Sequence, residues 1–227
     1  MANIAPRCDR MNSTQGPTAP VTPMPQQSPS LPATQIPTTS IPSPIAKILS
    51  KMRMNERNAN IQEEGLMELR NLAYNNENNK VKIADAGGIT TILSAMKTHS
   101  SNATVQENGC AALLCLAYPI KKNQETIAEA GGITTILSAM KIHSSNATVQ
   151  ENGCGALQNL AWNNDKNQVT IADAGGIITI LSAMKTHSSN ATVQEKGCAA
   201  LRNLAVNGNN KVTMADAGGI ITILSAM

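Results

Sequence analysis

The sequence predicts an all-α fold, in which near-identical helical repeats stack into a solenoid behind a disordered N-terminal tail. The stretch that begins at Gly87 (GGITTILSAMKTHSSNATVQENGC) returns almost unchanged at Gly131 and Gly175, with a period of 44 residues. Within it, apolar residues recur with the spacing of an amphipathic helix. The chain has no Phe, two Tyr and one Trp, so its core must be aliphatic, which suits thin helix-on-helix packing. Self-similarity at about 40–47 residues is typical of helical solenoids.

The first part of the chain, residues 1–43, is rich in Pro, Ser, Thr and Gln. Ten of the eleven prolines lie between Pro6 and Pro44. A segment with so few large apolar groups cannot bury enough surface to offset its chain entropy. We therefore expect a disordered tail with some polyproline II character. Its PxxP and Ser/Thr-Pro pairs arise from composition, so a solvated leader is a simpler interpretation than an SH3-type or kinase site.

The repeat array is expected to occupy residues 44–227. It starts with a degenerate copy, PIAKILSKMRMNERNANIQEEG, which places Pro44 in the first turn of a helix, where proline is tolerated. One partial repeat, three full repeats and a second partial repeat are predicted at residues 44–73, 76–117, 120–161, 164–205 and 207–227.

Each full repeat is predicted to contain three helices. In residues 76–117 the first is short, spans 79–86 and ends at two glycines, which supply a positive φ. The second carries its apolar residues at helical spacing on one side (Ile89, Ile92, Leu93, Met96) and polar ones on the other (Thr90, Ser94, Lys97). The third starts either at a capping box from Thr104 to Glu107 or at an Asn102 cap. It runs to Ala117 and buries five residues: Val105, Ala112, Leu113, Leu116 and Ala117.

These helices, with the AGGI turn and the VQENGCAALxNLA pattern, resemble armadillo repeats. The most specific stretch is LRNLA at Leu69–Ala73 and Leu201–Ala205, and LQNLA at Leu157–Ala161. The resemblance covers residues 44–227. It implies a right-handed α–α superhelix whose third helices line a concave groove, where asparagines hold the backbone of an extended partner peptide. The residues that match this row are Asn71, Asn159 and Asn203, and Cys115 interrupts it.

Nuclear-import receptors of the armadillo family carry a tryptophan four residues before that asparagine. This chain has Met67, Ala111, Gly155 and Ala199 there instead. The difference argues against a receptor for nuclear localisation signals, although Met67 stays among the predicted partner-binding residues.

All three aromatic residues of the chain, Tyr74, Tyr118 and Trp162, recur at the repeat period at the ends of third helices. Two interpretations remain open. The rings pack the helix end against the next linker, or they anchor a partner in the groove, since Tyr and Trp dominate interface hot spots.

Other repeated residues have structural explanations. Equivalent residues lie one layer apart, about 8–10 Å, so His99, His143 and His187 cannot share a metal ion and are expected to interact with helix dipoles. Cys110, Cys154 and Cys198 are expected to be small buried residues, and Cys115 is expected to be exposed in the groove. No metal, cofactor or nucleotide site is predicted.

The predicted function is a non-enzymatic scaffold that binds a protein or an extended peptide, because no catalytic set exceeds what the repeat explains. The alternatives are a nucleic-acid-binding helical solenoid and a nuclear transport-type adaptor. Nucleic acid is disfavoured because the repeats hardly vary, whereas base-reading solenoids vary several side chains per repeat. The row Lys97, Lys141 and Lys185 is interpreted as a solvated face, or else as an acidic-partner or RNA contact. With no membrane span and no signal peptide predicted, we expect a cytoplasmic protein, with the nucleus as the alternative.

The C-terminal end is expected to be uncapped. The sequence stops at Met227 within a second helix, which leaves the apolar side of Ile220, Ile223, Leu224 and Met227 without a third helix. Repeat arrays need polar terminal caps. We therefore expect either a fragment of a longer array or a homodimer through this end, paired by two-fold symmetry.

Overall fold

The computed structural model describes residues 43–225. Predictions that concern the tail up to Pro42, or Met227, lie outside these residues. The described part forms one compact unit of thirteen α-helices, and no strand occurs within it. The prediction of an all-α solenoid is confirmed, and Pro44 is the first residue of the first helix, after a Ser43 cap.

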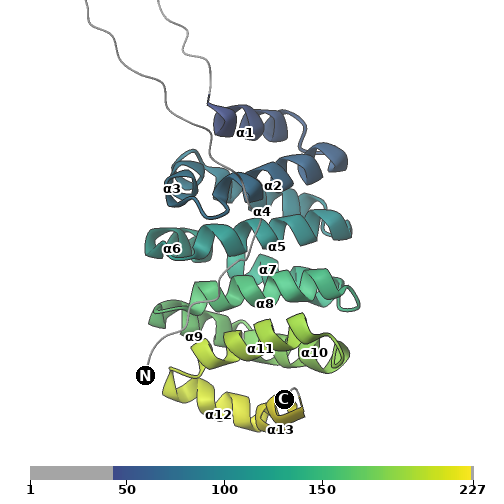
Figure 1. Ribbon diagram of the computed structural model, residues 1–227, viewed down its shortest axis with the longest axis vertical. Helices are drawn as coiled ribbons and strands as arrows, with labels where there is room; N and C mark the ends of the chain where they lie inside the picture. The colour runs from purple at the N-terminus through teal and green to yellow at the C-terminus, as the bar shows by residue number, and fades with distance from the viewer. Residues whose placement is uncertain (1–42, 226–227) are drawn as a thin grey trace, which may run out of the picture. The chain divides into compact units, whose positions relative to one another are not determined.

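The helices form successive layers (Figure 1). The first layer has two helices, α1 (Pro44–Met54) and α2 (Ala59–Ala73). Three layers of three follow: α3 (Glu77–Asp85), α4 (Gly88–Thr98) and α5 (Ala103–Ala117); α6 (Lys121–Glu129), α7 (Gly132–Ile142) and α8 (Ala147–Ala161); α9 (Asp165–Asp173), α10 (Gly176–Thr186) and α11 (Ala191–Leu204). The last described helices are α12 (Gly208–Asp216) and α13 (Gly219–Ser225).

Two stacks of equivalent helices run through the array. The third helices α2, α5, α8 and α11 lie side by side in Figure 1, and we call their outer surface the third-helix face. The second helices α1, α4, α7, α10 and α13 stack behind them, and we call their outer surface the second-helix face. The short first helices lie at the side of both stacks. This arrangement places each repeated side chain once per layer.

Asparagine side chains start the third helices. The Asn102 side chain accepts a hydrogen bond from the Val105 N–H at 3.0 Å, and the equivalent bonds start α2, α8 and α11 from Asn58, Asn146 and Asn190. The capping box from Thr104 to Glu107 is therefore a wrong prediction, and the Asn102 alternative is right. Glu107 has another partner, because its carboxylate accepts from the Asn146 side chain of the next layer at 2.7 Å.

The turn between first and second helices requires its glycines. Gly87, Gly131, Gly175 and Gly218 have φ between 74° and 81°, a region that glycine enters without a Cβ penalty. The glycine that follows each of them packs against the first helix. A Cβ on Gly132 would lie 2.7 Å from the Ile127 carbonyl oxygen, so the chain has no room for a side chain there.

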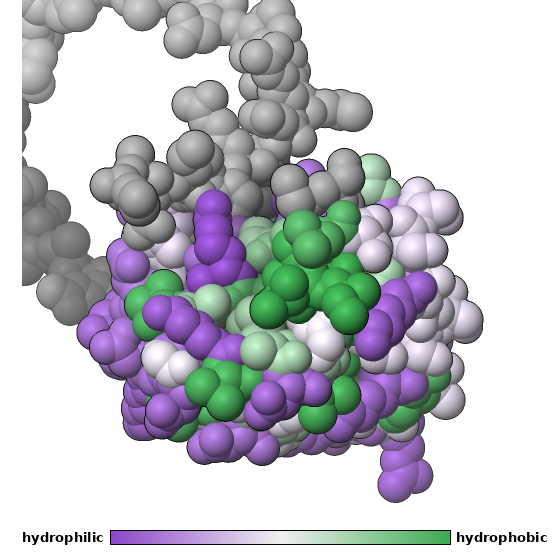
Figure 2. Space-filling view, turned by 90° about the horizontal axis from the view of Figure 1, so that it is seen from below, coloured by the Kyte–Doolittle hydropathy of each residue, from purple (hydrophilic) through white to green (hydrophobic). Residues whose placement is uncertain are grey.

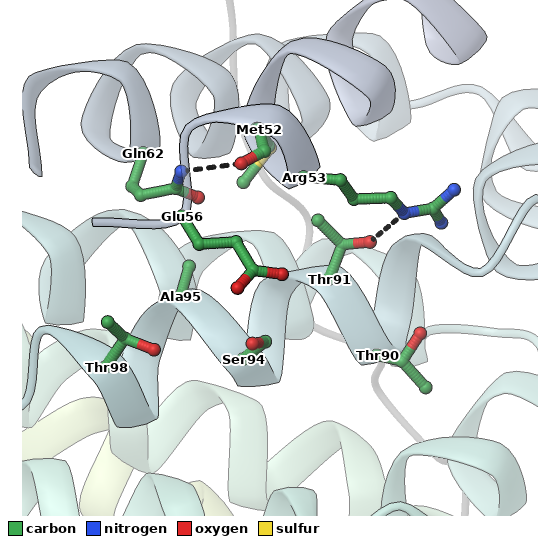
Figure 3. A pocket seen from close by; sticks show the side chains of 9 residues that line it. All are labelled: Met52, Arg53, Glu56, Gln62, Thr90, Thr91, Ser94, Ala95 and Thr98. Atoms are coloured by element: carbon green, nitrogen blue, oxygen red, sulfur yellow. Dashed lines mark hydrogen bonds between the residues drawn. The ribbon is translucent and has the colours of Figure 1, made fainter. Parts of the chain in front are cut away.

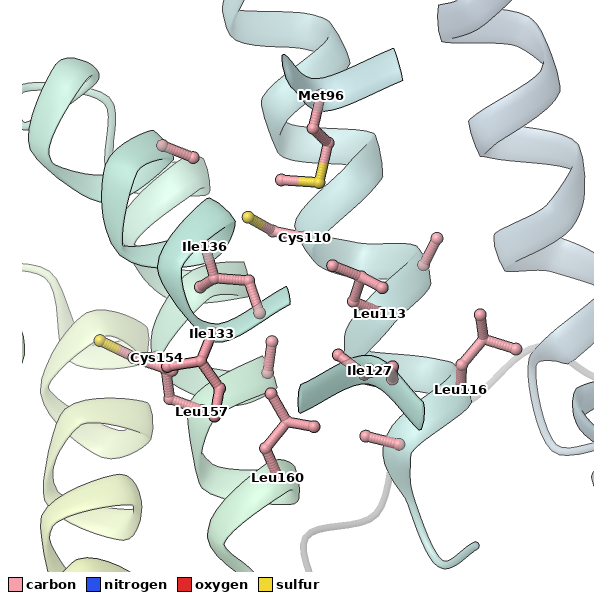
Figure 4. Close-up of a cluster of buried hydrophobic side chains, with 14 of the residues drawn as sticks. Met96, Cys110, Leu113, Leu116, Ile127, Ile133, Ile136, Cys154, Leu157 and Leu160 are labelled. Carbon is pink, nitrogen blue, oxygen red and sulfur yellow. The ribbon is translucent and has the colours of Figure 1, made fainter. Parts of the chain in front are cut away.

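Aliphatic side chains fill the core, as Figure 4 shows for Leu113, Leu116, Ile127 and their neighbours. The predicted inner residues of the second and third helices are buried, whereas Thr90, Ser94 and Lys97 are exposed. Second and third helices approach closely where a methionine meets a glycine. A Cβ on Gly109 would lie 2.5 Å from the Met96 Cγ, and the same pair recurs in each layer from Met52 and Gly65 to Met184 and Gly197.

No single helix among residues 43–225 is long and apolar enough to cross a membrane. Only α9 and α10 taken together reach the required length and apolar composition, and this pair is bent by 70° at the break between the two helices.

Apolar side chains reach the surface at the C-terminal end of the described array. Figure 2 looks onto this end and shows apolar surface among hydrophilic residues. The large exposed apolar residues of its last turns and helices are Val206, Val212, Ile220, Ile221 and Leu224.

Candidate protein-binding faces

The predicted asparagine row lies on the third-helix face, and two of its members bond to the neighbouring layer. The Asn159 Nδ2 donates to the Leu114 carbonyl at 2.9 Å, and the Asn203 Nδ2 donates to the Gln158 carbonyl at 2.9 Å. Both side chains are 7% exposed. Asn71, in the first third helix, is exposed. The row therefore holds layers together in its later members and is open to solvent in its first.

An asparagine amide has two N–H donors and a carbonyl acceptor. In Asn159 and Asn203 one donor is used by the preceding third helix. This bond fixes the side chain on its helix. Asn71 is exposed, and its side chain is not fixed by such a bond to a preceding third helix among the described residues.

The middle of the asparagine row, where Cys115 stands, is nearly inaccessible to solvent. Cys115 was expected to be exposed in the groove, but it is only 8% exposed. Small residues at Ala111 and Gly155 allow the third helices to lie close together, so that a Cβ on Gly155 would be 2.5 Å from the Leu114 Cδ1. Leu114 fills the space that a larger residue would take at Gly155, and little surface remains around Cys115.

The three aromatic residues are the C-caps of α2, α5 and α8. The rings of Tyr118 and Trp162 contact each other edge to face, with centroids 5.0 Å apart and planes at 65°. All three aromatic residues are half-buried. Packing at the helix end is thus observed for Tyr118 and Trp162, and the interpretation of the rings as partner anchors stays a prediction.

A row of glutamates was not singled out by the sequence analysis. Glu63, Glu107, Glu151 and Glu195 occupy equivalent places near the start of the third helices. Asparagines of the next layer hold the first two, at 2.8 Å from Asn102 to Glu63 and 2.7 Å from Asn146 to Glu107. The signal in the sequence was the recurrence of one charged residue in each layer.

The histidine row bonds to the preceding layer. Each Nε2 donates to a backbone carbonyl: His99 to Glu56 at 2.7 Å, His143 to Ser100 at 2.8 Å and His187 to Ser144 at 2.8 Å. The residues cap second helices, as expected for the C-terminal end of a dipole. The imidazoles therefore join layers.

The cysteine row contains two kinds of thiol. Cys110 and Cys154 are fully buried, and loss of solvation raises the pKa of each thiol to about 12. Cys198, predicted to be buried with them, is partly exposed, because α11 is the last third helix among the described residues. Burial still raises the pKa of the Cys198 thiol, which disfavours the reactive thiolate.

Grooves lie between consecutive second helices. They have volumes of about 270, 300 and 240 Å³ between α1 and α4, α4 and α7, and α7 and α10. Figure 3 shows the first, where the Arg53 Nε donates to the Thr91 hydroxyl at 3.0 Å and the Gln62 Nε2 donates to the Met52 carbonyl at 2.9 Å. Lys97, Lys141 and Lys185, which follow Arg53 in the equivalent places, are exposed.

The family model described as LRRK2 ARM repeat matches residues 48–227. Among solved structures, two crystal structures of engineered proteins from the Northeast Structural Genomics Consortium are similar to this chain. The first has a TM-score of 0.71 and 24% identity, and the match covers 79% of this chain and 70% of that one. The second has a TM-score of 0.70 and 24% identity, and the match covers 78% of this chain and 42% of that one. These likenesses bear on the fold alone. None of the curated proteins matches the sequence.

Proposed function

Because the chain belongs to the LRRK2 ARM repeat family, whose repeats are armadillo-like, we propose that it is a non-enzymatic scaffold that binds a protein or an extended peptide on its third-helix face. One observation carries the proposal. Four third helices lie side by side and present equivalent side chains in rows, one per layer. An extended chain repeats its backbone groups just as regularly, so one set of contacts serves along its whole length.

The first third helix offers the most accessible contacts. Met67, Asn71 and Tyr74 are spaced by four and three residues, which places them on one side of α2. Met67 is 45% exposed and Asn71 is exposed. Methionine adapts its shape to different apolar groups, and the amide bonds both donors and acceptors of a backbone. This end is therefore the proposed anchor of the partner.

From α2 the proposed path follows the row to Asn159, Trp162 and Asn203. It crosses three layer steps of about 10 Å each, which correspond to roughly ten extended residues at ~3.3 Å per residue. The contact between Tyr118 and Trp162 fixes both rings, so little conformational entropy remains to be lost there on binding.

Charge separates this proposal from nucleic-acid binding on the same face. The described third helices carry six carboxylates (Glu63, Glu64, Glu68, Glu107, Glu151, Glu195) and three cationic side chains (Arg70, Lys196, Arg202). Nucleic-acid binding needs a basic surface that neutralises phosphates. The excess of carboxylates favours a protein partner.

The proposal is tested by identifying a partner with the full chain as bait and mass spectrometry as readout, then measuring its affinity by calorimetry. Asn71→Ala and Trp162→Ala should each weaken binding by more than ~1 kcal/mol. Lys141→Ala, on the opposite face, is the matched control and should leave the affinity unchanged. If only the lysine variant lost affinity, the partner would bind on the second-helix face, and the proposed site on the third-helix face would be wrong.

A further inference from the structure

The second and third helices of the described array carry opposite excesses of charge, and one ion pair, Lys51 with Glu64, joins them in the first layer. The second helices and the turns that follow them comprise residues 43–58, 87–102, 131–146, 175–190 and 218–225. In these segments Glu56 is the one acidic residue, against seven cationic ones: Lys47, Lys51, Arg53, Arg57, Lys97, Lys141 and Lys185. The third helices have the opposite excess, as described above. A surface with so uneven a composition attracts partners of opposite charge.

The central cations of the second-helix face form a line. Lys97, Lys141 and Lys185 are exposed, lie in the last turn of α4, α7 and α10, and recur once per layer. Arg53 occupies the same place in the first layer, but its guanidinium donates to the Ala86 carbonyl at 2.8 Å and to the Gly87 carbonyl at 3.2 Å. Arg53 is thus used to hold α1 on the next layer, and the line of accessible amines starts at Lys97.

Each of the next two grooves combines one such amine with exposed hydroxyls. Lys97 and Ser138 line the groove of about 300 Å³, and Lys141 and Ser182 line the groove of about 240 Å³. Both serines are exposed. Neither groove has an acidic residue in its lining, whereas the first groove contains Glu56. A carboxylate that enters either groove meets an ammonium donor and a hydroxyl donor together.

The spacing and the chemistry of this face select one class of partner. We propose that the second-helix face is a second binding surface, which takes an extended acidic segment of a partner protein with a carboxylate at every third residue. Layers are about 8–10 Å apart, and three residues of a polyproline II segment, which make one full turn, span about 9 Å and return the side chains to the same side. Lys97, Lys141 and Lys185 then pair with three successive carboxylates, and the serine hydroxyls complete the contacts in the grooves.

Other anions fit this face less well. Single-stranded nucleic acid binds through base stacking on aromatic rings as well as through phosphates, and all three aromatic residues of the chain cap third helices instead. Anionic membranes are recognised by a compact cluster of about 4–8 basic residues, whereas Lys97, Lys141 and Lys185 lie one layer apart.

The test uses the full chain and fluorescence anisotropy at low ionic strength. The probe is a labelled synthetic peptide of serine and glycine with glutamate at every third position. A second peptide of the same composition has its glutamates in one block. The spaced peptide should bind more tightly than the block peptide. The triple variant Lys97→Gln, Lys141→Gln, Lys185→Gln should weaken binding of the spaced peptide about tenfold, as expected for three exposed ion pairs.

The control is the triple variant Lys82→Gln, Lys121→Gln, Lys211→Gln, which removes the same net charge from exposed positions on first helices. It should leave binding nearly unchanged. Equal losses in both triple variants, equal binding of the two peptides, or tighter binding of an oligouridylate or of anionic vesicles would each overturn the proposal. Lys141→Gln alone repeats the comparison against Lys121→Gln if the triple variant loses helical circular dichroism.

Discussion

The side-chain amide of Asn159 donates a hydrogen bond to the backbone carbonyl of Leu114, 2.9 Å away in the preceding third helix. A residue of the predicted partner-binding row therefore also holds two layers together. The two roles can be separated, because Asn71 occupies the equivalent place in α2 and is exposed.

Asn159→Ala should lower the free energy of unfolding by about 1–3 kcal/mol, because the Leu114 carbonyl loses its donor in a nearly closed site. Asn71→Ala should change stability by less than ~0.5 kcal/mol. Urea denaturation followed by circular dichroism measures both. Similar stability losses in the two variants would show that Asn71 also has a structural role.

The start of α5 offers a paired test of its cap. Asn102→Ala should cost about 1–2 kcal/mol of stability, because it removes the bond to the Val105 N–H and the bond to the Glu63 carboxylate. Thr104→Ala should be nearly neutral, since Thr104 is exposed and is not the cap. A larger loss of thermal stability in Thr104→Ala than in Asn102→Ala would show that Thr104 is the cap, as the capping-box prediction had it.

Two glycines should respond in opposite ways to alanine. Gly132→Ala should destabilise the chain by about 1–3 kcal/mol, because its Cβ would lie 2.7 Å from the Ile127 carbonyl oxygen, which belongs to the backbone. Gly155→Ala should be neutral or stabilising by up to ~1 kcal/mol, since the flexible end of Leu114 can move aside and alanine favours the helix. The equivalent residues Ala111 and Ala199 are already alanine. A large loss from Gly155→Ala in denaturant titration would contradict this argument.

The two buried thiols should make the free energy of unfolding decrease with pH in the alkaline range. Burial raises the pKa of Cys110 and Cys154 from 9.0 to about 12, so the folded chain holds protons that the unfolded chain releases. Stability should therefore fall as the pH rises from about 9 toward 12. The double variant Cys110→Ala, Cys154→Ala should show a shallower fall in urea titrations across this range.

At about pH 8, native iodoacetamide labelling should modify Cys198 before either buried thiol, because the thiolate is the reactive form. Peptide mapping resolves the sites.

Much of the fold follows from the sequence because the determinants are local. The spacing of Ile89, Ile92, Leu93 and Met96 predicts the buried side of α4, and the paired glycines predict the turn before it. Polar residues that bond to a neighbouring helix are harder to predict. Gln106 has the composition of a surface residue, yet it is 2% exposed and its Nε2 donates to the Met96 and His99 carbonyls at 2.9 Å each.

The sequence placed the candidate residues on third helices, but it did not predict how far each is exposed. Asn71 is exposed, whereas Asn159 and Asn203 are only 7% exposed. The burial of Cys115 depends on how closely the third helices approach, which is set by Ala111, Gly155 and Leu114 together. Sequence spacing along one helix carries no information about that distance.

The histidine bonds have a consequence for how the array could have grown. His99, His143 and His187 donate to the backbone of Glu56, Ser100 and Ser144, so the acceptor is kept although the residue that supplies it changes. The bonds of Asn159 and Asn203 likewise end on the backbones of Leu114 and Gln158. A joint made to main-chain atoms does not require a matched pair of side chains across it. Tandem duplication of a 44-residue coding unit would thus create a working junction at once, without compensating mutations, and repeats this similar are what such duplication leaves behind.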